Sequence, residues 1–229
     1  QKTKEGNNMD NRKNYYLTID TETTNSLEDA LVYDIGGAIH DKKGNILEKF
    51  SFVISDIFIY NKDLMQSAYY KEKIPRYYEQ IENGTRTVTT FFKARKHIIK
   101  LMKKYNVTAV VAYNARFDIN ALNTTMRYLT KSKFRYFFPY GTVIYDSLKM
   151  TRDTIAKQKS YSDFCHKNGF LTRHRKPQLQ VKAETVYKYM TNNLEFVESH
   201  TGLKDVLIEI QIFARCMRQH KPMRKLLWA

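Results

Sequence analysis

Cysteine, long apolar runs and acidic side chains are all scarce in this chain. Its two cysteines, Cys165 and Cys216, are too few for a disulfide framework or a zinc site, so we expect reduced thiols and a cytoplasmic protein. No apolar run approaches the roughly 18 residues of a membrane helix, and the polar first residues lack the apolar core of a signal peptide. A protein bound to a membrane surface would need a basic amphipathic helix with a bulky apolar face, and no segment has that pattern. We therefore expect no membrane partner.

The shortage of acid leaves a large excess of positive charge. The 229 residues include 39 lysines and arginines against 23 aspartates and glutamates, which gives a formal net charge of +16. An excess of this size indicates a polyanionic partner, and nucleic acid is the first candidate. The alternative is a soluble protein that is generally basic and has no such partner. Hydrophobic residues make up 42% of the chain, which is ordinary for a globular protein with a real core.

Hydrophobic patterning predicts a mixed α/β fold. Alternating β-branched and aromatic residues indicate half-buried strands, and a continuous apolar run indicates a buried central one. The strands expected on these grounds are 15–24, 31–39, 46–54, 107–112 and a short one within 143–148. Helical spacing and capping residues predict helices that begin near Thr89, Asn114 and Thr201. Gly36 and Gly37 lie inside the second strand, where small residues permit another segment to approach closely.

One domain accounts for most of the chain. Because we find no internal repeat and no long linker, we predict a domain over 14–221, a flexible lead-in over 1–13 and a tail over 222–229. The tail either docks through Trp228 or hangs free. Residues 56–88 are predicted to form a tyrosine-rich helical insertion, in which a proline interrupts any single helix. Its tyrosines either pack against the core or stack on bases.

Two acidic residues lie at the end of the first predicted strand. Asp20 and Glu22 are two residues apart, and because a strand has period two, both carboxylates leave the same face. Adjacent anions repel each other unless a cation neutralises them, and hard oxygen ligands at this spacing suit Mg²⁺ or Mn²⁺. An isolated Asp-x-Glu is more often a pair of solvated residues at a turn, so the interpretation depends on the rest of the chain.

Two further stretches complete the pattern. Asp118 lies at the start of a predicted helix, and Asn114, four residues earlier, shares its face. His200 and Asp205 lie at the start of the last long helix. Functional residues of α/β sheets gather at strand ends, so we expect these side chains to meet those of the first strand. By itself, His200 would more often be a surface residue at a helix start.

These residues resemble the three exonuclease motifs of the DEDD superfamily, in the histidine-containing branch that includes polymerase proofreading subunits and RNase T. The resemblance runs from about Tyr15 to Cys216. Phe117 and Asp146 also match the usual surroundings of the motifs, whereas Tyr113 stands where the family often has His or Gly. The resemblance implies a ribonuclease H-like fold, with a mixed five-stranded sheet flanked by helices.

The resemblance also implies an active site. It places two divalent ions, Mg²⁺ or Mn²⁺, on the carboxylates of Asp20, Glu22, Asp118 and Asp205. His200 would be the general base that takes a proton from the attacking water, and the ordinary pKa of histidine, about 6.5, suits that role. Contacts with the terminal nucleotide are implied for Thr23, Thr24, Asn114 and Phe117. Core packing explains Phe117 equally well.

The expected function is that of a two-metal-ion 3′→5′ exonuclease, which shortens single-stranded nucleic acid and releases nucleoside 5′-monophosphates. DNA is the first choice of substrate, and an RNA 3′-end-trimming ribonuclease of the same fold is the alternative, because no motif recognises a 2′-hydroxyl. Basic groups at 93–104, 127–135 and 173–176 would contact phosphates. A non-catalytic nucleic-acid-binding module is the alternative from another class. A third is a subunit that proofreads beside a replication polymerase, and the family also permits oligomers.

Overall fold

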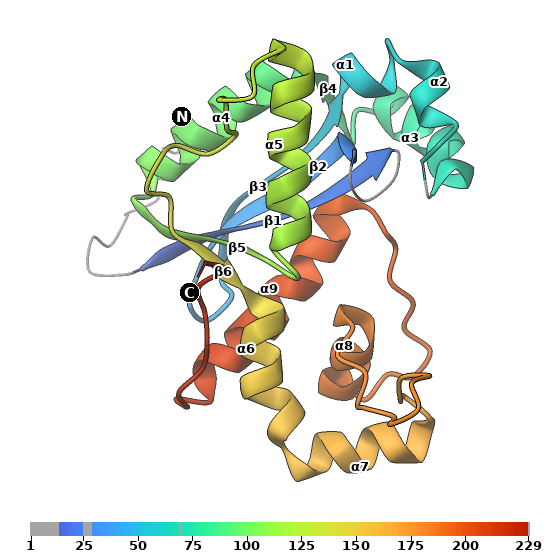
Figure 1. Ribbon diagram of the computed structural model, residues 1–229, viewed down its shortest axis with the longest axis vertical. Coiled ribbons are helices and arrows are strands. Elements are labelled where there is room, and N and C mark those ends of the chain that lie inside the picture. Colours follow the sequence, from blue (N-terminus) through green and yellow to red (C-terminus); the bar gives the residue numbers. More distant parts are fainter. Residues whose placement is uncertain (1–13, 25–28, 69, 229) are drawn as a thin grey trace, which may run out of the picture.

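The core of the protein is a six-stranded mixed sheet with strand order β4-β3-β2-β1-β5-β6 (Figure 1). The computed structural model describes residues 14–24, 29–68 and 70–228, so the predicted lead-in over 1–13 lies outside the described residues. The strands are β1 Tyr15–Thr24, β2 Leu31–Asp41, β3 Ile46–Ile54, β4 Thr87–Thr89, β5 Val107–Ala112 and β6 Ile144–Asp146. β1 pairs antiparallel with β2 and parallel with β5, and β2 pairs antiparallel with β3. The predicted α/β class is confirmed.

The sheet has one strand more than the five that the sequence predicts. The additional strand is β4, which pairs parallel with the end of β3. Its three residues are too few for an alternating pattern to show in the sequence. Thr89, the predicted helix cap, is the last residue of β4 instead, and the cap is Thr90, whose side chain accepts a hydrogen bond from the backbone of Lys93.

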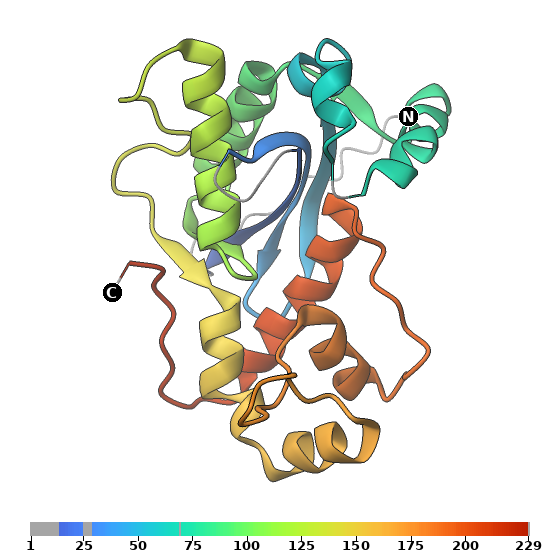
Figure 2. The same cartoon turned by 45° about the vertical axis from the view of Figure 1, so that its right-hand side comes forward.

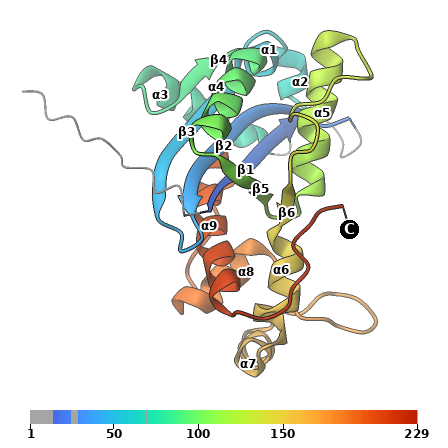
Figure 3. The ribbon, with the colours of Figure 1, turned by 90° about the vertical axis from the view of Figure 1, so that its left-hand side faces the viewer.

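Helices cover both faces of the sheet (Figures 1 and 3). They are α1 Ser55–Phe58, α2 Lys62–Met65, α3 Ile74–Glu82, α4 Phe91–Lys104, α5 Arg116–Thr130, α6 Ser147–Asp153, α7 Lys159–Asn168, α8 Ala183–Thr191 and α9 Gly202–Arg218, with short 3₁₀ turns at Lys71–Lys73 and Ile155–Lys157. α4 and α5 pack on one face and α9 packs against β1 and β2 on the other. In all three ribbon views, α6, α7 and α8 form a lower lobe below the sheet. No described helix is long and apolar enough to cross a membrane.

The alternation of β1 determines which helix each of its side chains meets. Leu17 and Ile19 enter the larger hydrophobic cluster, which contains the apolar residues of α4 and α5. Tyr16 points to the opposite face, where its ring lies 4.8 Å from that of Phe213 in α9. Because Asp20 is an even number of residues from Tyr16, its carboxylate leaves β1 on the α9 face.

α9 begins unusually close to the sheet. A Cβ atom on Gly202 would lie 2.6 Å from the backbone nitrogen of Gly36, and a Cβ on Gly36 would overlap the backbone of Gly202. Real Cβ atoms are not found at such distances, so glycine is required on both sides of this contact. The close approach predicted from the small residues of β2 is therefore present. It brings the first turn of α9 against the end of β1.

The segment predicted as a helical insertion over 56–88 contains α2, α3 and most of α1. Of its tyrosines, Tyr77 is buried in the core, which is one of the two expected roles, whereas Tyr60 is exposed. The proline that interrupts the pattern occupies the first turn of α3, where a missing N–H costs nothing.

The C-terminal tail docks along β6 (Figure 2). The backbone N–H of Leu227 donates to Ile144, and the N–H of Asp146 donates to Lys225. Leu227 is buried, while Trp228 is 59% exposed. The tail therefore docks, but through its backbone and Leu227 instead of through Trp228.

Candidate metal centre and active site

Three carboxylates meet where β1 ends and α9 begins. Asp20 and Glu22 come from one face of β1, and Asp205 comes from the first turn of α9. Each offers one oxygen, and these oxygens all lie within 4.8 Å of one another. This is the oxygen-only donor set that Mg²⁺ and Mn²⁺ prefer. The residues therefore fit a divalent cation.

Asp118 approaches the same place from the opposite face of the sheet. Its Oδ1 accepts hydrogen bonds from the backbone N–H of Thr21, at 3.0 Å, and from the Thr21 hydroxyl, at 2.8 Å. Thr21 lies between Asp20 and Glu22 in β1, so its side chain points toward α5. The structure thus brings the fourth predicted carboxylate beside the other three, with one oxygen already engaged by the strand.

The pKa values of these groups show how unfavourable their negative charges are together. Burial raises the pKa of Glu22 to about 9, and the nearby charges of Asp34 and Asp205 add to the effect. Burial also raises the pKa of Asp205 to about 7 and raises that of Asp20 well above its ordinary value. A bound cation would remove this penalty, because it stabilises the ionised forms.

Glu209 is a fifth carboxylate that our sequence analysis did not identify. It lies one helical turn after Asp205, is only 4% exposed and lines the same cavity. Its Oε2 has no hydrogen-bond partner among the described residues. Burial, with the charges of Asp118 and Asp205, raises its pKa well above the usual range. The sequence did contain one indication of this role: Glu209 interrupts an apolar pattern four residues after Asp205, a predicted ligand.

His200 lies beside the carboxylates in the loop before α9. Its ring stacks on that of Tyr70 from the insertion, with centroids 4.4 Å apart and planes 12° apart. Burial, together with the charge of Lys73, lowers the pKa of His200, so its imidazole is neutral at pH 7. Lys73 also donates a hydrogen bond of 2.8 Å to the carbonyl of Ser199, which anchors this loop to the insertion.

A buried ion pair connects the insertion to α9. Asp34 lies opposite Glu22 in β2 and is fully buried. Its Oδ2 accepts hydrogen bonds from the Tyr77 hydroxyl at 2.6 Å, the Arg86 guanidinium at 2.7 Å and the Gly202 backbone at 3.2 Å. Sequence analysis identified none of these contacts, because a lone aspartate in a strand gives no indication of its partners. The network holds the start of α9 in place behind the carboxylates.

The predicted substrate-binding residues have different environments. Asn114 lines the cavity and has a positive φ of 64°, a conformation that asparagine tolerates well. Thr24 is buried and its hydroxyl donates to the carbonyl of Leu31, while Phe117 packs against the hydrophobic core. Thr23 is half-buried and does not line the cavity. Of the four, only Asn114 is placed to touch a molecule in the cavity.

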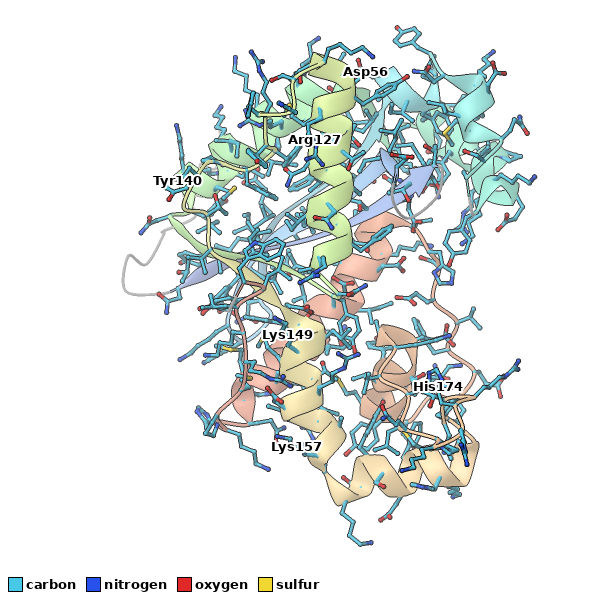
Figure 4. All side chains as sticks on the ribbon, viewed as in Figure 1. Asp56, Arg127, Tyr140, Lys149, Lys157 and His174 are labelled. Atoms are coloured by element: carbon cyan, nitrogen blue, oxygen red, sulfur yellow. The ribbon has the colours of Figure 1, made fainter. Side chains whose placement is uncertain are left out.

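The cavity itself has a volume of about 1000 Å³. Its far wall comes from α6 and from the segment between α7 and α8, which contribute the basic side chains Arg152, His174 and Lys182. Figure 4 shows His174 beside α8, on the exposed loop that also carries Arg173, Arg175 and Lys176. The site is therefore acidic at its base and basic along its wall, which suits a phosphodiester substrate held against cations.

No protein-family model matches this chain, and no curated protein matches it in sequence. Solved structures do resemble it. The zinc-bound complex of E. coli Exonuclease I with single-stranded DNA aligns with a TM-score of 0.56 at 16% identity, over 92% of this chain and 42% of that one. Exonuclease I from Methylocaldum szegediense aligns with a TM-score of 0.52 at 17% identity, over 91% and 41%. Cell-death related nuclease 4 aligns with a TM-score of 0.51 at 11% identity, over 93% and 67%.

These likenesses establish the fold. The expected ribonuclease H-like α/β architecture is confirmed. The chain spans about two fifths of the length of the Exonuclease I chains that it resembles.

Proposed function

We propose that this protein is a metal-dependent 3′→5′ exonuclease that acts on single-stranded nucleic acid, with DNA as its first substrate. The observation that carries the proposal is the meeting of Asp20, Glu22 and Asp205, within 4.8 Å, beside a neutral histidine in an exonuclease fold. Two of the Exonuclease I structures that share this fold are complexes, one with a dT13 oligonucleotide and one with single-stranded DNA. The basic wall of the cavity supports the same class of substrate.

Asp20, Glu22, Asp118 and Asp205 would hold two divalent ions. Bound ions of this kind, Mg²⁺ or Mn²⁺, lower the pKa of a coordinated water and stabilise the leaving 3′ oxygen. Glu209 would add negative charge behind the site and so favour cation binding. Thr21 positions Asp118 through its two hydrogen bonds.

His200 would take the proton from the attacking water. A general base must be unprotonated at the working pH, and the lowered pKa of His200 meets that condition. The Tyr70 ring stacked on it and the anchored loop before α9 restrict where the imidazole can lie. The product would be a nucleoside 5′-monophosphate, because the bond to the 3′ oxygen is the one broken.

Asn114 is our candidate for contact with the terminal nucleotide, because it projects into the cavity next to the carboxylates. Thr23 is a weaker candidate, and the inward-facing Thr24 and Phe117 would act only through packing. Cytoplasmic location agrees with the free, buried state of Cys165 and Cys216. Association with a replication polymerase is a further hypothesis, which co-purification with a tagged polymerase would test.

The test is degradation of matched DNA and RNA oligonucleotides labelled at the 3′ or the 5′ end, with Mg²⁺, Mn²⁺ or EDTA. We expect stepwise shortening from the 3′ end that requires metal, with DNA cut faster than RNA. Asp205→Asn should abolish it, and Asp163→Asn, at an exposed carboxylate on α7, should not. Faster cutting of RNA would identify the ribonuclease alternative. Tight binding without turnover in either metal would leave a non-catalytic binding module.

A further inference from the structure

Large exposed aromatic side chains are carried by the loop between α5 and β6 and by the C-terminal tail. Phe134 is 77% exposed, Tyr136 is 58% exposed, Tyr140 is fully exposed and Trp228 is 59% exposed. The first three belong to the loop between α5 and β6, and the fourth belongs to the tail docked on β6. We call these four residues, with the basic side chains beside them, the aromatic–basic surface. Exposed aromatics in this number indicate a binding surface, because soluble proteins rarely expose them together.

A cavity of about 580 Å³ lies within this surface. Tyr136, Tyr140 and Trp228 line it, together with Ile119 and Asn123 from the outer side of α5. None of the described residues that line it is acidic. The loop is fixed to α5 because the side chain of Asn123 accepts a hydrogen bond of 2.9 Å from the Phe137 backbone. The backbone that carries Tyr136 and Tyr140 is therefore held against α5.

The surface is basic as well as aromatic. Residues 119–145 contain no aspartate or glutamate but include Arg127, Lys131, Lys133 and Arg135. Three cations lie over aromatic rings: Arg116 over Trp228 at 5.5 Å, Lys131 over Tyr128 at 4.6 Å and Lys133 over Phe134 at 5.1 Å. Exposed rings interleaved with cations and free of acids are the composition of a platform for unpaired bases and phosphates. A docking site for a basic or neutral protein would not need this charge.

Arg116 connects the surface to the candidate active site. It begins α5, two residues after Asn114, which lines the cavity of the site, and two residues before Asp118. Its guanidinium reaches the ring of Trp228. In Figure 4, Tyr140 lies on the opposite side of α5 from His174.

We propose that the aromatic–basic surface binds the single-stranded segment that lies upstream of the 3′ end, with its bases stacked on Tyr136, Tyr140 and Trp228. This proposal rests on the proposed function for the polarity of the strand. It gives the protein a preference for long single strands, because a short oligonucleotide fills the active site without reaching the surface.

Trp228 makes the proposal directly measurable, because it is the only tryptophan in the chain. An Asp20→Asn variant, which cannot degrade its ligand, is titrated with oligothymidylate of about 4 or about 16 nucleotides. Tryptophan emission and the anisotropy of a labelled oligonucleotide are followed together. We expect both lengths to bind, and only the long one to quench Trp228.

Substitution provides the second measurement. Tyr140→Ser should weaken binding of the long oligonucleotide at least about fivefold, the lower end of the effect of one stacked aromatic, and leave the short one unchanged. Tyr60→Ser is the matched control, since Tyr60 is also an exposed tyrosine, at 75%, and lies in the insertion. It should change neither affinity.

Three results would overturn the proposal. In the first, anisotropy shows that the long oligonucleotide binds, but Trp228 emission does not change and Tyr140→Ser binds as tightly as the parent variant. The strand would then lie elsewhere, and the exonuclease assignment would stay intact. Self-association in sedimentation that Tyr140→Ser abolishes, with unchanged binding of the long oligonucleotide, would make this surface a contact between copies. If neither the short nor the long oligonucleotide binds, this proposal and the proposed function are overturned together.

Discussion

Glu209 shows how much a single buried carboxylate depends on its surroundings. An anion that is 4% exposed, with one oxygen unpartnered and two aspartates nearby, is destabilised unless a proton or a cation accompanies it. A raised pKa in the folded state means that stability is greatest below the unfolded pKa and is lost as the pH rises. Without metal, Glu209 therefore opposes folding at neutral pH.

We expect Glu209→Gln to raise the free energy of unfolding in EDTA at pH 7, because the variant removes a buried carboxylate whose ionisation the fold opposes. The gain should vanish below pH 4.5, where the glutamate of the unfolded chain is protonated as well. Mg²⁺ should stabilise the variant less than it stabilises the wild type. Urea unfolding with and without Mg²⁺ measures both effects, and exposed Glu195→Gln is the control. An equal response to Mg²⁺ would remove Glu209 from any role in cation binding.

The effect of pH on stability through His40 is opposite to that through Glu209. Burial lowers its pKa to about 4, and its ring nitrogens contact the Thr18 hydroxyl at 2.7 Å and the Asp41 carbonyl at 2.8 Å. The unfolded chain takes up a proton near pH 6.5 and the folded chain does not until about pH 4. Acid therefore favours unfolding in this interval.

Wild type should lose about 3 kcal/mol of stability through this group between pH 6.5 and pH 4, the product of the pKa difference and 1.36 kcal/mol. His40→Gln cannot titrate and should lose that much less over the same range. Because the carboxylates act on both proteins alike, the difference between their urea midpoints isolates His40. Parallel pH profiles would contradict the expectation.

At the scale of elements, the insertion is fixed to α9 by one buried ion pair. The side chains of Asp34 and Arg86 are 0% and 6% exposed, and the same Asp34 oxygen accepts from Tyr77 and Gly202. Removing one partner of such a pair leaves the other charge buried, which costs more than the pair contributes. Loss of Arg86 should therefore disturb the start of α9 as well as the insertion.

Arg86→Met should lower the free energy of unfolding by about 3–5 kcal/mol, because Asp34 is left charged and buried. Lys159→Met, which breaks the exposed pair with Asp163, should have little effect on stability, because solvent screens that pair. Guanidinium unfolding measures both. If the first variant still folds, limited proteolysis should cut the insertion first. A cost for Arg86→Met as small as that for Lys159→Met would show that the pair is dispensable.

The elements that could be predicted from sequence are those with a full hydrophobic period. β1 and β3 have their predicted bounds, and α9 begins one residue after the predicted Thr201. β4 was not predicted, because Thr87–Thr89 pairs only through its backbone with β3. Strand period predicted that Asp20 and Glu22 share a face, and the motif resemblance implied that Asp205 joins them. Glu209 and Asp34 were missed because a charged residue in an apolar pattern reads as solvent-facing until its neighbours are known.

At the scale of the whole molecule, the basic residues behind the net charge of +16 do not all lie near the candidate site. Three basic segments were predicted to contact phosphates, but α4, which carries the residues at 93–104, lies on the face of the sheet opposite α9. The loop at 173–176 instead adjoins the wall of the candidate site through His174. Charge should therefore matter by position as well as by amount.

Replacing Arg173, Arg175 and Lys176 by glutamine should weaken binding of single-stranded oligonucleotides and reduce their salt dependence. Each phosphate contact on a single strand contributes about 0.7 to the slope of log affinity against log salt, so three lost contacts should lower it by about 2. The control replaces Lys93, Lys96 and Lys100 by glutamine. These residues are also exposed, on α4, and their replacement removes the same amount of charge. If overall charge alone governs binding, both triple variants will lose the same slope. If the fold directs the strand past the 173–176 loop, only the first will, and titration by anisotropy at several salt concentrations separates the two.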